Sequence, residues 1–232
     1  MSDESSTPDI AEQSLDADTQ RAAVRDRYGQ LATTSGSCCH HVDLNKEPPH
    51  SGEYLDLGCG DPTAIANLET GDTVLDLGSG GGFDCFRAAK HVGSDGHVIG
   101  VDMTPEMVDT ARERAEARDT GTVEFRLGEI EHLPVANTSI DVVLSDCVIN
   151  LSPDKSRVFR KAYRALRPGG NLVISDIVAT TELPTDVQHD PDAVAACIGG
   201  ATAMRDYERL LTACRVHGDH DRINDRGPAL CL

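Results

Sequence analysis

Short apolar segments alternate with amphipathic ones through the middle of the chain, and this alternation restricts the fold more than any other feature. Bounded apolar runs predict five buried strands, at 73–78, 97–102, 123–128, 139–149 and 171–178. The segments between them predict helices at 83–92, 104–118 and 152–170. Because strands that alternate with helices at this spacing are joined by right-handed crossovers, we expect a doubly wound α/β sheet.

The predicted helix ends follow from capping residues. Thr104 is expected to cap the second of these helices with Pro105 at its first position, and Ser152 to cap the third. The Pro-Gly-Gly segment at 168–170 is expected to close that third helix. A further helix is expected at 19–31, and one or two on either side of Gly199 and Gly200. The C-terminal tail shows no strand pattern.

Acidic residues dominate the 232-residue chain, with 39 Asp and Glu against 21 Lys and Arg and a net charge of −18. Such a surface repels phosphates and anionic lipids, so we expect neither a nucleic-acid nor a membrane partner. The N-terminus lacks a secretory pattern, which favours a cytoplasmic protein. Many acids with few lysines favour a halophilic protein whose self-repulsion is screened by salt, although an ordinary acidic enzyme remains the alternative.

Eight cysteines are numerous for an intracellular chain. Without a secretory signal they indicate metal ligands, redox groups or nucleophiles rather than a disulfide framework. No Cys-x-x-Cys pair occurs, so any site for a soft ion must gather distant thiolates through the fold.

A glycine-rich turn follows the first predicted strand, in the sequence DLGSGGGFD at 76–84. Gly78 and Gly80 allow close approach of a ligand to the backbone at a helix N-terminus. Phe83 occupies the position of the last glycine of a dinucleotide fingerprint, which argues against NAD. Asp102 ends the second predicted strand, where an acid can accept bonds from two ribose hydroxyls.

The pattern DLGSGGG, VD, GEIEHLP and LRPGG resembles that of the class I S-adenosylmethionine-dependent methyltransferases, over about residues 70–178. The resemblance implies a Rossmann-like sheet and S-adenosylmethionine as cofactor. It also implies a set of binding residues around the methionine part, the ribose and the adenine: Asp76, Gly78, Ser79, Gly80, Asp102, Met103, Glu129 and Ile130. For Met103 and Ile130, packing in the core remains an equal alternative.

A closer resemblance covers most of the chain. The segments LGCGDP, VLDLGSGGGFDCF, VIGVDMTPEM, EFRLGEIEHLP, CVINLSPDK and CIGGA are similar to those of arsenite methyltransferases. This resemblance implies that Cys59, Cys147 and Cys197 bind trivalent arsenic. It further implies that the Cys38 and Cys39 pair takes part in thiol exchange with a reductant such as thioredoxin or a small thiol.

The chemistry of arsenic agrees with three thiolates. Trivalent arsenic is soft and selects sulfur, and a trigonal thiolate pyramid leaves its lone pair free to accept a methyl group without a general base. Cys85 is expected to be a core residue, and Cys214 and Cys231 to be incidental. Two alternatives stay open: a methyltransferase of a small organic substrate, and an inactive, truncated module that binds thiol-reactive ions.

The resemblance divides the chain into an acidic tail (1–18), a helix and cysteine-bearing loop (19–70), a methyltransferase domain (71–213) and an irregular tail (214–232). Two acids depart from the family pattern: Asp61 and Asp146 occupy positions where Asn is usual. Their charges are expected to raise the pKa of neighbouring thiols. The resemblance stops at Ala213, so we expect the sheet to lack the C-terminal strands of the family.

Overall fold

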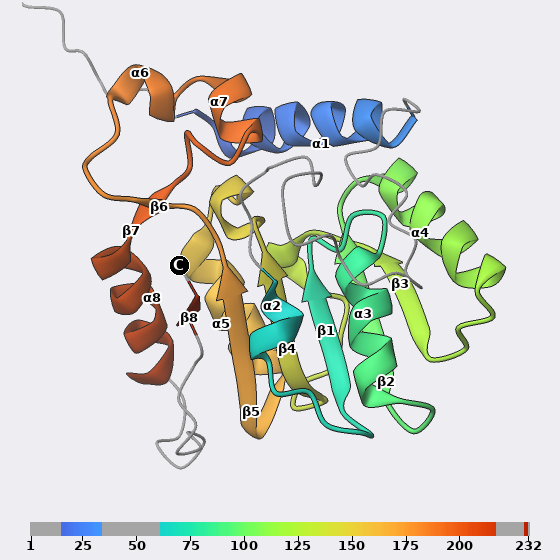
Figure 1. The fold of residues 1–232 in the computed structure, drawn as a ribbon. Helices are drawn as coiled ribbons and strands as arrows, with labels where there is room; N and C mark the ends of the chain where they lie inside the picture. The colour runs from blue at the N-terminus through green and yellow to red at the C-terminus, as the bar shows by residue number, and fades with distance from the viewer. Residues whose placement is uncertain (1–14, 34–60, 217–229, 232) are drawn as a thin grey trace, which may run out of the picture.

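The computed structural model describes residues 15–33, 61–216 and 230–231. Its main sheet has six parallel strands in the order β3-β2-β1-β4-β5-β8 (Figure 1). The strands are β1 Thr73–Leu77, β2 His97–Asp102, β3 Val123–Leu127, β4 Ile140–Asp146, β5 Leu166–Ser175 and β8 Leu230–Cys231. A second, two-stranded parallel sheet pairs β6 Val178–Ala179 with β7 Thr202–Ala203. The predicted doubly wound α/β sheet is therefore confirmed.

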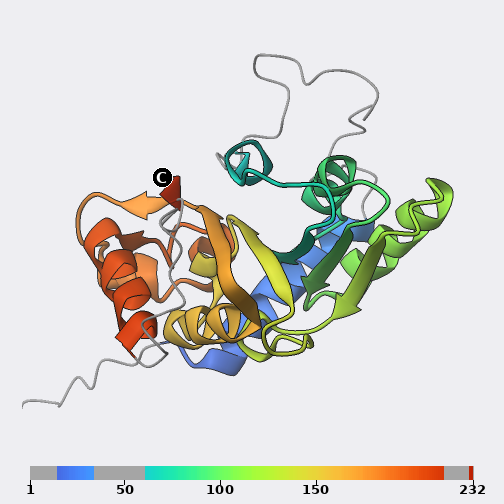
Figure 2. The ribbon, with the colours of Figure 1, turned by 90° about the horizontal axis from the view of Figure 1, so that it is seen from below.

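Helices cover both faces of the main sheet (Figure 2). They are α1 Ala17–Thr33, α2 Pro62–Ile65, α3 Phe83–Val92, α4 Pro105–Ala117, α5 Lys155–Ala165, α6 Thr185–Gln188, α7 Pro191–Ala195 and α8 Met204–Val216, with short 3-10 helices at Ile130–His132 and Ile149–Leu151. α3 and α4 pack on one face, and α5 and α8 on the other. None of the helices in the described ranges is long and apolar enough to cross a membrane.

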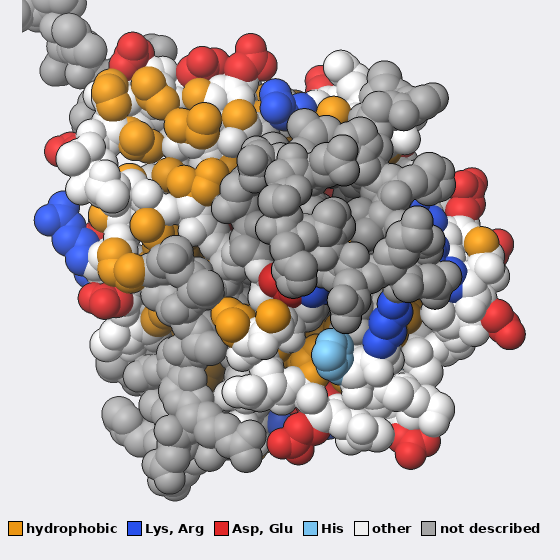
Figure 3. Space-filling view, in the orientation of Figure 1, with side chains coloured by type: hydrophobic (Ala, Val, Ile, Leu, Met, Phe, Trp, Pro, Cys, Tyr) orange, Lys and Arg blue, Asp and Glu red, His pale blue; other side chains and the backbone are white. Residues whose placement is uncertain are grey.

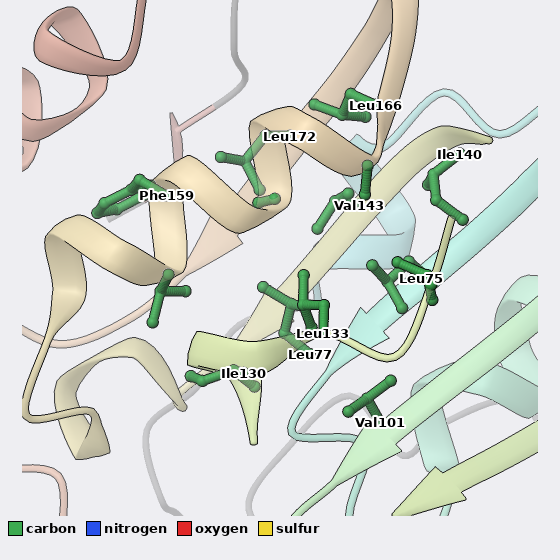
Figure 4. Close-up of a cluster of buried hydrophobic side chains, with 14 of the residues drawn as sticks. Leu75, Leu77, Val101, Ile130, Leu133, Ile140, Val143, Phe159, Leu166 and Leu172 are labelled. Carbon is green, nitrogen blue, oxygen red and sulfur yellow. The ribbon is translucent and has the colours of Figure 1, made fainter. Parts of the chain in front are cut away.

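Alternation of side chains along the strands produces two separate cores. On β1, Val74 faces α3 and α4, whereas Leu75 and Leu77 face α5. Figure 4 shows Leu75 and Leu77 in the core that faces α5, together with Phe159 of that helix. Both faces of the inner strands β1, β2 and β4 are buried, which explains why these strands are mostly apolar.

The third long helix differs from the prediction at both ends. Its N-cap is Asp154, whose carboxylate accepts a hydrogen bond from the Arg157 backbone N–H at 2.8 Å. Ser152 does not cap it, because its hydroxyl donates to Glu131 at 2.7 Å. The Pro-Gly-Gly segment lies inside β5, where the register with β4 shifts. Proline has no N–H to donate, so it is tolerated at such an irregularity.

Two expectations about strands were also wrong. β4 ends at Asp146, and the following residues form a turn instead of continuing the strand as far as Ile149. The C-terminal tail, expected to contain no strand, contributes β8, which pairs with Ile174 and Ser175 of β5. Strands of two residues are too short to show a period in sequence. Over the described residues, β8 covers only this end of the outer edge of β5.

The N-terminal helix lies across the carboxyl ends of the strands (Figure 1). It is longer than the predicted 19–31 and spans Ala17–Thr33. Val24 of this helix is buried in a cluster with Leu151 and Cys197, and the Gln20 side-chain amide donates a buried hydrogen bond of 3.0 Å to the Leu151 carbonyl. These contacts hold α1 over the carboxyl ends of the strands, which is where ligands bind in open α/β folds.

Candidate active site at the carboxyl ends of the strands

The glycine-rich turn between β1 and α3 is folded tightly against β2. The backbone N–H groups of Gly78 and Ser79 both donate to the Val101 carbonyl, at 2.8 and 3.0 Å. Gly78 has a φ of 67°, and a Cβ there would lie 2.3 Å from a methyl carbon of Val148. Only glycine satisfies this combination of left-handed backbone and close packing.

The end of β2 meets the same turn. The Gly80 N–H donates to one Asp102 carboxylate oxygen at 2.9 Å, and the Thr104 N–H donates to the other at 2.8 Å. Burial raises the pKa of Asp102. A Cβ on Gly80 would meet nothing within 4 Å, so the turn faces open space at this point. The Asp102 carboxylate is thus held at the rim of the turn, with lone pairs left for a ligand.

One buried hydroxyl of this turn is available for a ligand. Ser79 is 8% exposed, and its Oγ has no hydrogen-bond partner in the described part of the chain. Since buried polar atoms in native proteins are normally satisfied, the atom fits a polar ligand group. Together with Asp102, it suits the hydroxyl and amino groups of a nucleoside-type cofactor.

Several buried carboxyl groups lie close together at the base of the site. Burial, followed by the charge of Asp84, raises the pKa of Asp76 well above its usual range. Burial raises the pKa of Asp84 to about 6, against the opposing effect of Arg87, and raises that of Asp146 to about 7. A cationic ligand would relieve the repulsion among these groups, whereas an anionic one would increase it.

Cys85 lies behind this acidic group and not in the site. Its side chain is fully buried, and its thiol donates to Asp76 at 3.2 Å. Burial, together with the Asp76 charge, raises its pKa well above the usual range. This position agrees with the core role expected for Cys85.

The raised acid pKa values predict a pH-dependent stability. When the pKa of a carboxyl group is higher in the folded than in the unfolded protein, the folded protein becomes less stable as pH rises from the unfolded pKa to the folded one. For Asp84 this range is from about pH 4 to about pH 6. The melting temperature should therefore fall between about pH 4 and about pH 6, and Asp84→Asn should reduce the fall. The exposed Asp186→Asn is the control in the same thermal melts. An identical pH profile for Asp84→Asn and the native protein would contradict this assignment.

The structure brings Cys147 and Cys197 together. Cys147 directly follows β4, and its N–H donates to the Ser175 carbonyl at 2.8 Å. The Cys197 thiol donates to the Cys147 carbonyl at 3.0 Å. Both residues have left-handed backbones, with φ values of 50° and 65°. Such backbones are unfavourable for non-glycine residues and are concentrated at functional sites.

The Cys197 thiol is enclosed by α1 and nearby acids. The residue is 5% exposed, and burial, followed by the charge of Asp176, raises its pKa to about 11. A hydrogen bond from Tyr28 and the charge of Arg27, both on α1, act in the opposite direction. Asp146 raises this pKa further, as expected from its charge.

Other features of the cysteine site bear on its access and chemistry. Cys147 is disulfide-bonded, whereas Cys197 is a free thiol. Both pack in one cluster with Met103, which links them to the end of β2. Ile198, the residue after Cys197, is half-exposed. Figure 3 shows hydrophobic side chains gathered on the part of the surface formed by α6 and α7.

The other predicted site residues are Glu129, Ile130 and three further cysteines. The Glu129 carboxylate faces α1, 3.7 Å from Arg21, and lies 3.1 Å from His132. Ile130 is 8% exposed and belongs to the core beneath α5, which agrees with the alternative of core packing. The predictions for Cys38, Cys39 and Cys59 fall outside the described residues.

A buried polar network adjoins the cysteines and was not predicted. The Asn150 side-chain amide donates to Asp176 at 2.8 Å, and its oxygen accepts from the Tyr207 hydroxyl at 2.8 Å. Asn150 occurs in the CVINL segment, and Asp176 is an acid inside the otherwise apolar fifth predicted strand, so both carried a sequence signal. Tyr207 carried none, because its partners lie more than thirty residues away in the chain.

Two curated proteins with similar sequences have the same description. The chain is 49% identical over 222 residues to an arsenite methyltransferase of Halobacterium salinarum, which covers 84% of this chain and 57% of that protein. It is 42% identical over 220 residues to an arsenite methyltransferase of Aquipseudomonas alcaligenes, covering 86% and 62%. The chain thus spans about three-fifths of the length of these curated relatives.

The fold comparison agrees with the sequence comparison. An arsenic(III) S-adenosylmethionine methyltransferase from Chlamydomonas reinhardtii superposes with a TM-score of 0.61 at 37% identity, covering 84% of this chain and 61% of that one. The family model described as "Methyltransferase domain" matches residues 68–215, which include β1 to β5 and the glycine-rich turn. On this match and this fold, the chain belongs to the methyltransferase-domain family.

Proposed function

We propose that this protein uses S-adenosylmethionine to methylate trivalent arsenic held by the thiolates of Cys59, Cys147 and Cys197. The observation that carries the proposal is the 3.0 Å contact between the Cys197 thiol and the Cys147 carbonyl, beside the glycine-rich turn. A small organic substrate would give no reason for two cysteines fifty residues apart to meet there. The names of the curated relatives support the same substrate.

The binding residues fit a cationic nucleoside cofactor. Gly78, Ser79 and Gly80 would hold its methionine part, and Asp102 its ribose. Asp76 would face its ammonium group, whose positive charge would favour the ionised form of this carboxyl. When bound, the cofactor supplies a methyl group on a positively charged sulfur. The acids around the turn favour binding of a ligand that carries positive charge.

The adenine side of the site would be formed by Met103 and by backbone groups. Met103 lies at the end of β2, next to Asp102, where it would pack on the base. The Glu129 carboxylate is held by cations of α1, so its backbone and that of Ile130 are the groups left to meet the adenine edge.

Arsenic capture requires no prior loss of protons from the site. Arsenous acid and three thiols give three As–S bonds and three waters, because each thiol proton leaves with one hydroxyl group. The high pKa of Cys197 therefore slows capture but does not prevent it. The bound arsenic keeps its lone pair, and the protein's task is to aim that pair at the methyl group.

A thiol reductant is part of the proposed reaction. Cys147 is disulfide-bonded in the structure, and it must be reduced before it can bind arsenic. Transfer of a methyl cation to the lone pair oxidises arsenic by two electrons. Two thiolates return those electrons when they couple as a disulfide, which thioredoxin or a small thiol would then reduce, with the Cys38 and Cys39 pair as the exchange group.

Asp102→Ala is expected to weaken S-adenosylmethionine binding by about tenfold or more. The ribose would lose an acceptor of charge-assisted hydrogen bonds, and the Gly80 and Thr104 N–H groups would lose theirs. Titration calorimetry with S-adenosylmethionine and with NAD measures the effect. NAD binding as tight as that of S-adenosylmethionine would overturn the cofactor assignment.

The decisive test of the function is product analysis. The reduced protein is incubated with arsenite, a reductant and S-adenosylmethionine labelled on its methyl group, and arsenicals are separated and identified by mass spectrometry. Labelled methylarsenicals are the expected result. Arsenic binding without methylation would favour a binding module, and the absence of both would return weight to an organic substrate.

A further inference from the structure

The polar network beside the cysteines is fully enclosed and connects three chain segments. Asp176 accepts hydrogen bonds from the side chain and backbone N–H of Asn150, from the Ile177 N–H at 2.9 Å and from the Tyr207 hydroxyl at 3.3 Å. Asn150 and Tyr207 have no exposed surface, and Asp176 is 7% exposed. Groups buried to this degree are costly unless every partner is in place, so the network defines a single arrangement.

The segments that follow Cys147 and Cys197 both contact this network, each three residues after its cysteine. Cys147 is three residues before Asn150, and its N–H is bonded to Ser175, the residue before Asp176. Cys197 is three residues before Gly200, and Gly200 lies directly on the Asn150 carbonyl, where an added Cβ would be 1.9 Å from the oxygen. The segments therefore touch twice, at the Cys147 carbonyl and at the Asn150 carbonyl.

Tyr207 contacts Asn150 through its side-chain hydroxyl, whereas Gly200 contacts Asn150 at the backbone carbonyl. It extends from α8, the helix that follows the Cys197 segment, and its hydroxyl donates to Asn150. Its ring packs edge-on against Phe159 of α5, with ring centroids 6.1 Å apart. The hydroxyl consequently links the segment after Cys197 to the turn after Cys147.

We propose that Asn150, Asp176 and Tyr207 are positioning residues that fix the spacing of the Cys147 and Cys197 thiols and so set the affinity for arsenicals that bind two thiols. The inference rests on the proposed function, although it concerns capture and not methyl transfer. A metalloid bridging two thiols depends on their separation, and a misplacement of about 1 Å can cost roughly a hundredfold in a well-oriented site. A reagent that attacks one thiol has no such dependence.

The test compares a two-thiol reagent with a one-thiol reagent. The full chain carries Cys38→Ser, Cys39→Ser and Cys59→Ser, so that phenylarsine oxide cannot use those cysteines, and is reduced before use. Tyr207→Phe then removes only the hydroxyl. The matched control is Tyr163→Phe on α5, a half-buried tyrosine whose hydroxyl makes no hydrogen bond within the described residues. Cys197→Ser verifies that the probe binds at this site.

We expect Tyr207→Phe to weaken phenylarsine oxide binding by about tenfold or more, while iodoacetamide alkylates Cys197 at an unchanged rate. Tyr163→Phe should change neither quantity. Unchanged phenylarsine oxide affinity in Tyr207→Phe, or a parallel change in alkylation, overturns the proposal. If Tyr207→Phe does not fold, Asp176→Asn is judged by phenylarsine oxide affinity alone, because loss of the Asp176 charge lowers the pKa of the Cys197 thiol and so speeds its alkylation. Unchanged affinity in this variant overturns the proposal.

These measurements are separate from the test of the function. Weakened phenylarsine oxide binding in a protein that forms no methylarsenicals would support the positioning role and reject the methyltransferase activity. If the native protein methylates arsenite and Tyr207→Phe binds phenylarsine oxide with unaltered affinity, the activity is supported and the positioning role is rejected.

Discussion

Cys147→Ser, Cys197→Ser and Cys59→Ser should each abolish methylation of arsenite. A serine hydroxyl is a hard, poorly ionised ligand, and the loss of one thiolate leaves arsenic bound by two protein groups and badly aimed. We expect a loss of at least about a hundredfold in rate, measured as labelled methylarsenicals formed per unit time. Full activity in any of the three variants would remove that cysteine from the site.

Two other cysteines provide the controls. Cys214→Ser removes a half-buried free thiol of α8 and should leave the rate unchanged. Cys85→Ser should lower thermal stability without changing the chemistry, because its thiol is buried against Asp76.

A methylated arsenical separates the three ligands further. It has only two positions left for thiolates, so one cysteine becomes dispensable in the second methylation. Since Cys147 and Cys197 meet in the fold, we expect Cys59, or the Cys38 and Cys39 pair, to be the dispensable group. Rates with methylarsenite as substrate test this order.

Gly200→Ala should have the largest effect on stability. A Cβ at this position would lie 1.9 Å from the Asn150 carbonyl oxygen, which is backbone and cannot rotate away. We expect a loss of about 3 kcal/mol or more in the free energy of unfolding, in the range of severe overpacking. Urea unfolding followed by circular dichroism measures it.

Gly121→Ala is the matched control for this prediction. Gly121 is exposed, and a Cβ there would meet nothing within 4 Å, so its replacement should change stability by less than about 1 kcal/mol. Equal midpoints for the two variants would show that the Cys197 segment moves away from Asn150 at little cost.

Much of the fold could be predicted because its signals are local. α3 and β2 have the predicted bounds, since apolar periodicity and a turn at each end are properties of neighbouring residues. The turn at Gly78 was equally legible, because only glycine tolerates its backbone. Helix capping was less predictable: Ser152 and Asp154 are both good caps, and a distant partner, Glu131, took the Ser152 hydroxyl.

By itself, therefore, the sequence determined the order of strands and helices, the position of the glycine-rich turn and the candidate ligands, the last through family resemblance. Only the tertiary structure decided which groups meet. The contact of Cys197 with Cys147 spans fifty residues, and Tyr207 reaches Asp176 across thirty-one. The Glu129 carboxylate likewise pairs with Arg21 of α1, more than a hundred residues earlier in the chain. Such contacts depend on how whole elements pack, and no periodicity or local propensity encodes them.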